Sequence, residues 1–408
     1  MKRAIVFVTW LVVFGSSSAS AQENRNLLPL GEREAALANT GITSPTSAAV
    51  FYNPANLTRI RHPTVSMTGT TLLRFDVSVD ALVVVDGVNQ PFRSSGFVTI
   101  PASLASTYPI GKFTLATAIL VPSATESENQ VALDFDSFRA TILSEERSDE
   151  LWIGASLARP ITDSVSAGLS AFAVSQRQSS FTVIELVDEL DDALLSTSRL
   201  TTNALGGTAV AGLSWVASDR LVFGARVQVP LVRIRGQSEA YEATVDTLLG
   251  ELDSQSETRD DFQRVMPWDL GFGVSLRASS SVELLADANA SLPVRYRPLL
   301  HESSEESLQL ALRASAAAEI ALSTSSKLRL GLLYNGSASP TPKVEGDSKE
   351  DYYGATIGVS RRSGATETGL GAFFLRSRGK YLPLDGSGET VATRTHLLGG
   401  LLTVTYQL

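Results

Sequence analysis

Residues 308–322 read LQLALRASAAAEIAL, and this stretch decides the fold class. Its even positions are apolar, from Leu308 to Leu322, whereas its odd positions include Gln309, Arg313 and Glu319. A period of two residues is that of a β-strand whose two faces meet different surroundings. The alternation lasts for fifteen residues, which exceeds the ~3–10 residues of a strand in a soluble protein. The stretch therefore predicts a tall strand with one apolar face.

The same pattern recurs from about residue 63 to the end of the chain. The final strand places Leu398, Leu402 and Tyr406 on one face and Thr403 on the other. Short turns and long acidic stretches strictly alternate between the strands. The short turns fall at 109–111, 160–163, 217–219, 278–281, 323–326 and 362–365, and the long stretches at 122–147, 176–200, 236–259, 294–306, 338–350 and 379–390. The pattern predicts an all-β fold, a fourteen-stranded antiparallel transmembrane β-barrel with long extracellular loops.

The composition excludes several other classes of protein. Beyond the N-terminus no apolar run approaches the ~18 residues of a membrane-spanning helix, which excludes a polytopic helical membrane protein. With no cysteine and three histidines, we expect neither a metal site nor a cofactor. The 34 basic and 43 acidic residues argue against nucleic-acid binding. Recurring Gly-x-Ser fragments, such as Gly168-Leu-Ser170, never complete a nucleophile elbow, so we expect no enzyme and interpret them as small residues facing the lumen or a neighbouring strand.

The first residues predict an export signal. Lys2 and Arg3 precede an apolar stretch from Ala4 to Phe14, and small residues follow up to Ala21. This order is typical of a secretory signal peptide over residues 1–21, cleaved after Ala21. Its removal takes the formal net charge from −9 to −11. The barrel pattern then predicts that the mature chain resides in the bacterial outer membrane.

Residues 22–62 do not alternate and form a separate, turn-rich segment ahead of the barrel at 63–408. Gly41 and the run Tyr52-Asn53-Pro54-Ala55 stand just before the first strand. This passage resembles the N-terminal hatch of the FadL/TodX family, outer-membrane transporters of long-chain fatty acids and aromatic hydrocarbons. A barrel of this size needs a plug to be sealed. We then expect charged side chains of this segment to pair with charges on the lumen wall: Glu32, Arg33, Glu34, Arg59 and Arg61. For Arg59 and Arg61, a solvated position in the periplasm is the open alternative.

The resemblance implies a function and its residues. Hydrophobic compounds would diffuse passively through a channel, captured first by the loops after the third and fifth strands. The groove candidates there are Phe135, Phe138, Ile184, Leu186, Val187 and Leu190, some at helical spacing. The compound would pass to an internal pocket for which Leu27, Leu28 and Leu30 are candidates. The resemblance also implies a lateral gate at a kinked third strand, although residues 112–121 lack glycine and only Pro101 and Pro122 flank the region.

Two alternatives remain open from the sequence. The apolar loop faces could simply pack on one another and cap the barrel. The protein could also be a non-transporting surface barrel: an adhesin, a phage-receptor-like protein or a structural outer-membrane protein. The hatch motif favours transport, because a purely structural barrel does not need it. The expected partners are a hydrophobic small molecule, outer-membrane lipid and the barrel-assembly machinery, with the protein as a monomer.

Overall fold

The computed structural model describes residue 24 and residues 27–85, 88–134, 138–188, 193–246, 251–263, 265–297, 305–343, 347–383 and 388–408. Over these residues fourteen antiparallel strands form a closed ring, which confirms the predicted barrel. Its strands are β1 (Thr64–Val85), β2 (Val88–Ile110), β3 (Phe113–Asp134), β4 (Phe138–Pro160), β5 (Val165–Asp188), β6 (Ala193–Ser218), β7 (Leu221–Gln228), β10 (Asp269–Arg277), β11 (Val282–Ser291), β14 (Ala311–Ala321), β15 (Ser326–Asn335), β16 (Ser348–Ser363), β17 (Thr366–Tyr381) and β18 (Val391–Gln407).

Pairing of the last strand with the first closes the ring. Thr64 of β1 faces Gln407 of β18, and the register continues to Val79 and Thr393. The outer face of β18 carries exposed Leu398, Leu402 and Tyr406, as the alternation predicts. An apolar outer face is what a strand in contact with lipid requires. Among the described residues no helix is long and apolar enough to cross a membrane.

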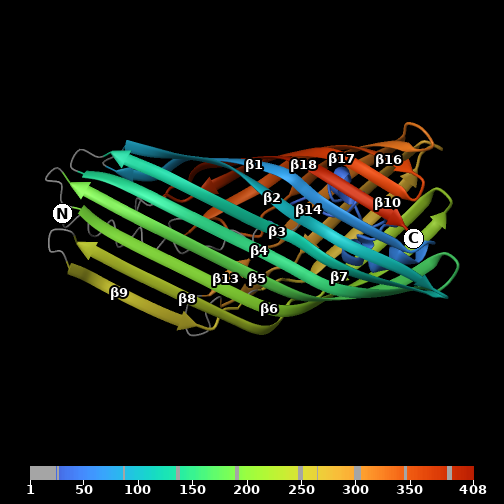
Figure 1. Cartoon of the computed structure of the whole chain (residues 1–408), viewed down its shortest axis with the longest axis horizontal. Helices are drawn as coiled ribbons and strands as arrows, with labels where there is room; N and C mark the ends of the chain where they lie inside the picture. Colours follow the sequence, from blue (N-terminus) through green and yellow to red (C-terminus); the bar gives the residue numbers. More distant parts are fainter. Residues whose placement is uncertain are drawn as a thin grey trace.

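The wall is not equally tall all round. Strands β3 to β6 have 22 to 26 residues, whereas β10, β11, β14 and β15 have 9 to 11. On the tall side, β8 (Val232–Asp246) continues the pairing with β6 above β7, and β9 (Glu251–Asp260) pairs with β8. A short hairpin, β12 (Val294–Tyr296) and β13 (Glu306–Leu308), follows β11. Figure 1 shows this asymmetry, with β8 and β9 standing out along one edge.

The long irregular loops predicted at 122–147 and 176–200 are wrong. Strands β3 and β4 remain paired up to Asp134 and Arg139, and β5 and β6 up to Val187 and Ala193. The prediction relied on the helical spacing of apolar residues in 176–200. The run from Phe181 is also rich in β-branched residues, which favour a strand. The tall hairpins extend the wall instead.

The N-terminal segment, defined as residues 27–63, lies inside the ring. It contains two 3-10 helices, η2 (Glu34–Leu37) and η3 (Pro54–Arg59), and the short helix α2 (Ala49–Tyr52). Its residues contact the inner faces of β5, β6, β7, β10, β15 and β16, and a chain that reaches so many strands must lie within the circle. Figure 1 shows the blue segment enclosed near the end of the barrel that carries the C-terminus.

Candidate functional site

The Asn-Pro-Ala run fastens the N-terminal segment to the wall. Asn53 precedes η3, and its side-chain oxygen accepts from the backbone N–H of Ala55 (3.2 Å), which caps the helix. The amide nitrogen of Asn53 donates to the carbonyls of Ile42 and of Leu213 on β6, both at 2.9 Å. Pro54 occupies the first turn, where its missing N–H costs nothing. The structure thus brings Asn53, Pro54 and Ala55 together at a point where the N-terminal segment is hydrogen-bonded to β6.

Tyr52 and Gly41, the other two residues of the predicted motif, are in contact. A Cβ on Gly41 would lie 2.5 Å from the Tyr52 ring, so only glycine fits at this position. The Tyr52 hydroxyl donates to the carbonyl of Leu30 (2.9 Å), and the backbone N–H of Gly41 donates to the Asp287 carboxylate on β11 (2.7 Å). The motif therefore sets both the internal packing and the wall contacts of the segment.

Gly-x-Ser fragments of the wall contact the N-terminal segment directly. A Cβ on Gly168 would meet the backbone of Pro54, and a Cβ on Gly212 would overlap the side-chain oxygen of Asn53. The neighbouring Ser170 donates its hydroxyl to the Val50 carbonyl at 2.6 Å. These fragments thus face the lumen, as expected, and absent side chains make room for the close approach of the N-terminal backbone.

A chain of ion pairs holds the segment on the short side of the wall. Arg33 bonds to Glu319 on β14 (2.9 Å) and to Glu283 on β11 (2.6 Å). Glu319 also bonds to Lys327 (2.9 Å) and Arg329 (2.8 Å) of β15. Arg33 and Glu319 are buried, so their contact is little screened by solvent. The sequence analysis named Arg33 but did not identify its acceptors. The available signal was a pair of acidic residues, Glu283 and Glu319, on the lumen face of two neighbouring short strands.

The other charged residues of 32–61 behave differently from Arg33. Glu32 accepts from the backbone N–H of Ser47 (2.9 Å) and the hydroxyl of Ser66 on β1 (3.2 Å). Burial, together with the neighbouring Glu34, raises the pKa of Glu32 to about 7. Arg59 donates to the Thr43 carbonyl (2.8 Å) within the segment. The pairing expected with the wall thus applies to only part of the set.

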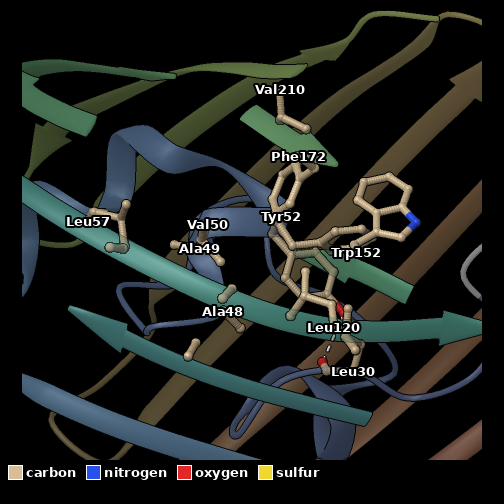
Figure 2. Packing of buried hydrophobic residues seen from close by; sticks show 14 of the residues in the cluster. Leu30, Ala48, Ala49, Val50, Tyr52, Leu57, Leu120, Trp152, Phe172 and Val210 are labelled. Carbon is tan, nitrogen blue, oxygen red and sulfur yellow. Dashed lines mark hydrogen bonds between the residues drawn. The ribbon is translucent and has the colours of Figure 1, made fainter. Parts of the chain in front are cut away.

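The tall side of the wall also meets the segment through apolar contacts. Phe51 packs edge-on against Trp152 of β4 with ring centroids 5.4 Å apart, and Trp152 lies 5.2 Å from Phe172 of β5. Leu30 and Leu120 of β3 belong to the same buried cluster. Figure 2 shows Trp152, Phe172, Leu120 and Leu30 of this cluster around Tyr52. Burial of such aromatic groups contributes on the order of 3 kcal/mol each.

Two of the three predicted pocket residues lie in a second apolar cluster. Leu27 and Leu28 pack against Phe373, Leu375 and the other buried residues of β1, β16, β17 and β18, with Val121 of β3 at the same cluster. Leu30 lies elsewhere, beside Tyr52. The structure therefore brings Leu27 and Leu28 together on an apolar inner wall and separates Leu30 from them.

Beside this second cluster the described pairing between β2 and β3 ends. It runs from Ile110 and Phe113 to Ser103 and Leu120, and no described pair follows above. At that point Val121 and Pro122 lie opposite the single residue Leu151 of β4, which is a β-bulge. Proline cannot donate to a ladder hydrogen bond and is found at such positions. The third strand thus carries its irregularity at the predicted flanking proline, without any glycine.

The predicted loop-groove residues are on strands or outside the described residues. Ile184 and Leu186 are buried on β5, where they pair across to Ile142 and Ala140 of β4. Val187 is half-buried on the same strand, and Phe138 begins β4. Phe135 and Leu190 lie outside the described residues. The described members therefore belong to paired strands of the upper barrel wall.

Comparisons with known proteins agree with this architecture. A crystal structure of a FadL homologue of Pseudomonas aeruginosa matches with a TM-score of 0.68 at 13% identity. The Pseudomonas putida toluene transporter TodX matches with 0.67 at 14%, and the Ralstonia pickettii toluene transporter TbuX with 0.61 at 15%. Each match covers 94% of this chain and 99% of the other. No family model matches the chain, and no curated protein does.

The described residues contain no group of three or more His, Asp or Glu able to hold a metal ion. The arrangement is that of a barrel with an interior segment, held by ion pairs on one side and by apolar packing and neutral hydrogen bonds on the other. The resemblance seen in the hatch motif therefore extends to the whole architecture: the chain has the fold of the FadL/TodX hydrophobic-compound transporters.

Proposed function

We propose that the protein is an outer-membrane channel for the passive uptake of hydrophobic compounds, such as long-chain fatty acids or aromatic hydrocarbons. In this proposal residues 1–21 are a signal peptide, residues 22–62 form the hatch and residues 63–408 form the barrel. The mature chain is a monomer inserted by the barrel-assembly machinery, and it is not an enzyme. The shared fold supports this reading, because its solved relatives include two toluene transporters.

The observation that carries the proposal is that an apolar cluster on the inner wall lies beside the point where the described β2–β3 pairing ends. Leu27, Leu28 and Val121 line the inside of the barrel at the height where the described β2–β3 pairing stops. A hydrophobic compound in the lumen would contact side chains of its own polarity there. Transfer of apolar surface out of water is favourable by roughly 25 cal/mol per Å². Lateral exit into lipid beside the bulge then needs no energy source.

The proposal also includes capture of the compound at the outer mouth, before it reaches the interior. Ile142, Ile184 and Leu186 are buried on neighbouring strands near the long-hairpin rim. We assign the first capture to these inner-wall residues, in place of an exposed helical groove. The polar bonds of the N-terminal segment would remain in place while the compound moves along the apolar side.

Uptake in a strain lacking the protein tests the proposal. Deletion of Pro122 removes the extra residue of the bulge and is expected to extend the β2–β3 pairing and close the side exit. Pro122→Ala keeps the residue count and serves as the matched control. We expect the initial uptake of radiolabelled oleate or toluene to be restored by the wild type and by Pro122→Ala, and to remain near the empty-vector rate with the deletion.

Two different results would count against separate parts of the proposal. Equal uptake with wild type and empty vector, over a panel of fatty acids and alkylbenzenes, would exclude transport and favour the non-transporting surface barrel. Full uptake by the deletion variant, with the protein folded as judged by heat-modifiable gel migration, would exclude the lateral exit beside Pro122 and leave an axial route.

A further inference from the structure

A set of basic side chains faces outward on neighbouring strands β17, β18, β1 and β2. The direction follows from the alternation, because Phe373, Leu375 and Leu397 pack inside the barrel with Leu28. On these strands the residues of the opposite parity must therefore point out, and so must their direct pairing partners on β1 and β2. The cationic patch, so defined, consists of Arg74, Arg93, Arg376, Arg378, Lys380 and Arg394, all exposed.

The strand register places the members of this patch side by side. Arg376 pairs with His396, which pairs with Asp76, and Arg394 pairs with Ser78, which pairs with Arg93. A depression of about 300 Å³ lies on this surface, and Arg93, Arg394, His396 and Asp76 are among its lining residues. Arginines from two strands, Arg93 of β2 and Arg394 of β18, therefore line one hollow of the outer wall.

The patch follows directly above an apolar belt. On β17 the outward residues Leu370 and Phe374 precede Arg376. On β18, which runs in the opposite direction, Arg394 and His396 come first and the outward residues Leu398, Leu402 and Tyr406 follow toward the chain end. From the chain end to Leu398 is about ten residues, which rise roughly 25 Å in a tilted strand, the height of an outer-membrane apolar band. The patch thus lies at one membrane surface, on the side of the long hairpins, which in such barrels is the extracellular side.

The charges of the patch are largely uncompensated by the protein. The structure gives Arg74 a pair with Asp76 at 3.0 Å, but among the described residues no ion pair is present for Arg93, Arg376, Arg378 or Arg394. The outward acidic neighbours are Asp76, Asp80 and Asp351. A basic excess is conspicuous in a chain whose net charge is −9. An anion at this height would complete the electrostatics.

We infer that the cationic patch is a binding site for a phosphorylated lipid headgroup of the outer leaflet, with the acyl chains lying against the apolar belt of β17 and β18. Arginine forks match phosphate oxygens in geometry as well as in charge, and a bisphosphorylated diglucosamine lipid carries two phosphates on its headgroup. The inference requires the barrel to be in the outer membrane, as proposed, but not that it transports anything. An anchored lipid there would fix the strands that border the β1–β18 closure.

Native mass spectrometry of the full mature chain, refolded in detergent so that it carries no cell lipid, tests the inference. The probe is a bisphosphorylated diglucosamine lipid, compared with the same lipid after removal of its phosphates. Arg376→Gln/Arg394→Gln removes two patch cations, and Arg93→Gln/Arg378→Gln removes two others. The matched control is Arg177→Gln/Arg199→Gln, two exposed arginines of β5 and β6 on another sector of the wall.

We expect each patch variant to bind the bisphosphorylated lipid on the order of thirtyfold more weakly, since one cation near a lipid phosphate is worth about fivefold. The control variant should bind like the wild type, and removal of the phosphates should weaken wild-type binding similarly. Equal binding by patch and control variants, or indifference to the phosphates, overturns the inference. Displacement of the lipid by an equal concentration of inorganic phosphate overturns it too, because the site would then bind a free anion. Uptake assays on the same variants, run in parallel, measure transport independently, so failure of lipid binding can be distinguished from failure of the transport proposal.

Discussion

Replacement of Arg33 by methionine should loosen the N-terminal segment without unfolding the barrel. The change removes two charge-assisted hydrogen bonds, to Glu319 and Glu283, each worth about 1.5–3 kcal/mol. Glu319 retains Lys327 and Arg329 as partners, so it does not become an unpaired buried charge. The loss therefore falls near the lower limit, about 3 kcal/mol, which corresponds to roughly a hundredfold larger population of the undocked segment.

Thiol labelling can measure that population because the chain has no cysteine of its own. Thr43 is a suitable position for a single cysteine, since its side chain is buried and its hydroxyl has no described hydrogen-bond partner. We expect Arg33→Met to raise the labelling rate of Thr43→Cys about a hundredfold. Arg61→Met, which changes an exposed residue of the same segment, should leave the rate unchanged. An unchanged rate in Arg33→Met would refute the idea that ion pairs hold the segment.

Two further predictions use the same labelling assay. The pKa of Glu32 is raised by burial to about 7 from 4.5, so the docked segment holds this proton more tightly than the undocked one; docking should be most stable below pH 4.5 and weaken as pH rises towards 7. Glu32→Gln should abolish that pH dependence once the labelling rate is divided by that of an exposed cysteine at the same pH, because the thiolate fraction itself rises with pH. A pH dependence that persists after this division would belong to another group. Gly212→Ala should undock the segment by on the order of 2 kcal/mol, because the new methyl overlaps the side chain of Asn53. Gly69→Ala, which meets open space, is the matched control, and equal labelling of the two variants would contradict the steric account.

The barrel could be predicted from sequence because lipid imposes a simple rule on every strand. An outward residue must be apolar and an inward one need not be, so the two-residue period in 282–291 and 311–321 is visible without any alignment. The hatch motif was accessible for a different reason. A Cβ on Gly41 would overlap the Tyr52 ring, and the amide of Asn53 both caps a helix and bonds to the wall, so each residue type matches the contacts at its position.

The prediction failed where one sequence fits two periods. In 181–187 apolar residues recur at helical spacing, yet Ile184 and Leu186 also lie on one face of a strand. Pairing partners decide between the two, and those on β4, such as Ile142 opposite Ile184, are far away in the chain. The acceptors of Arg33 were missed for the same reason, since Glu283 and Glu319 become neighbours only when β11 pairs with β14.

The division of the N-terminal segment into a polar and an apolar side bears on how a compound could pass it. On the side of β11 and β14, movement would break the bonds of Arg33, and uncompensated loss of a buried ion pair costs about 3–5 kcal/mol. On the side of Leu28 and Val121, a hydrophobic compound would replace one apolar contact by another, at little net cost in free energy. Passage along the apolar side therefore needs no removal of the segment. Under the proposed function, the Arg33 ion pairs would help to seal the tube to water and ions, and the bulge at Pro122 would offer a direction in which a hydrophobic compound is as stable outside the barrel as inside.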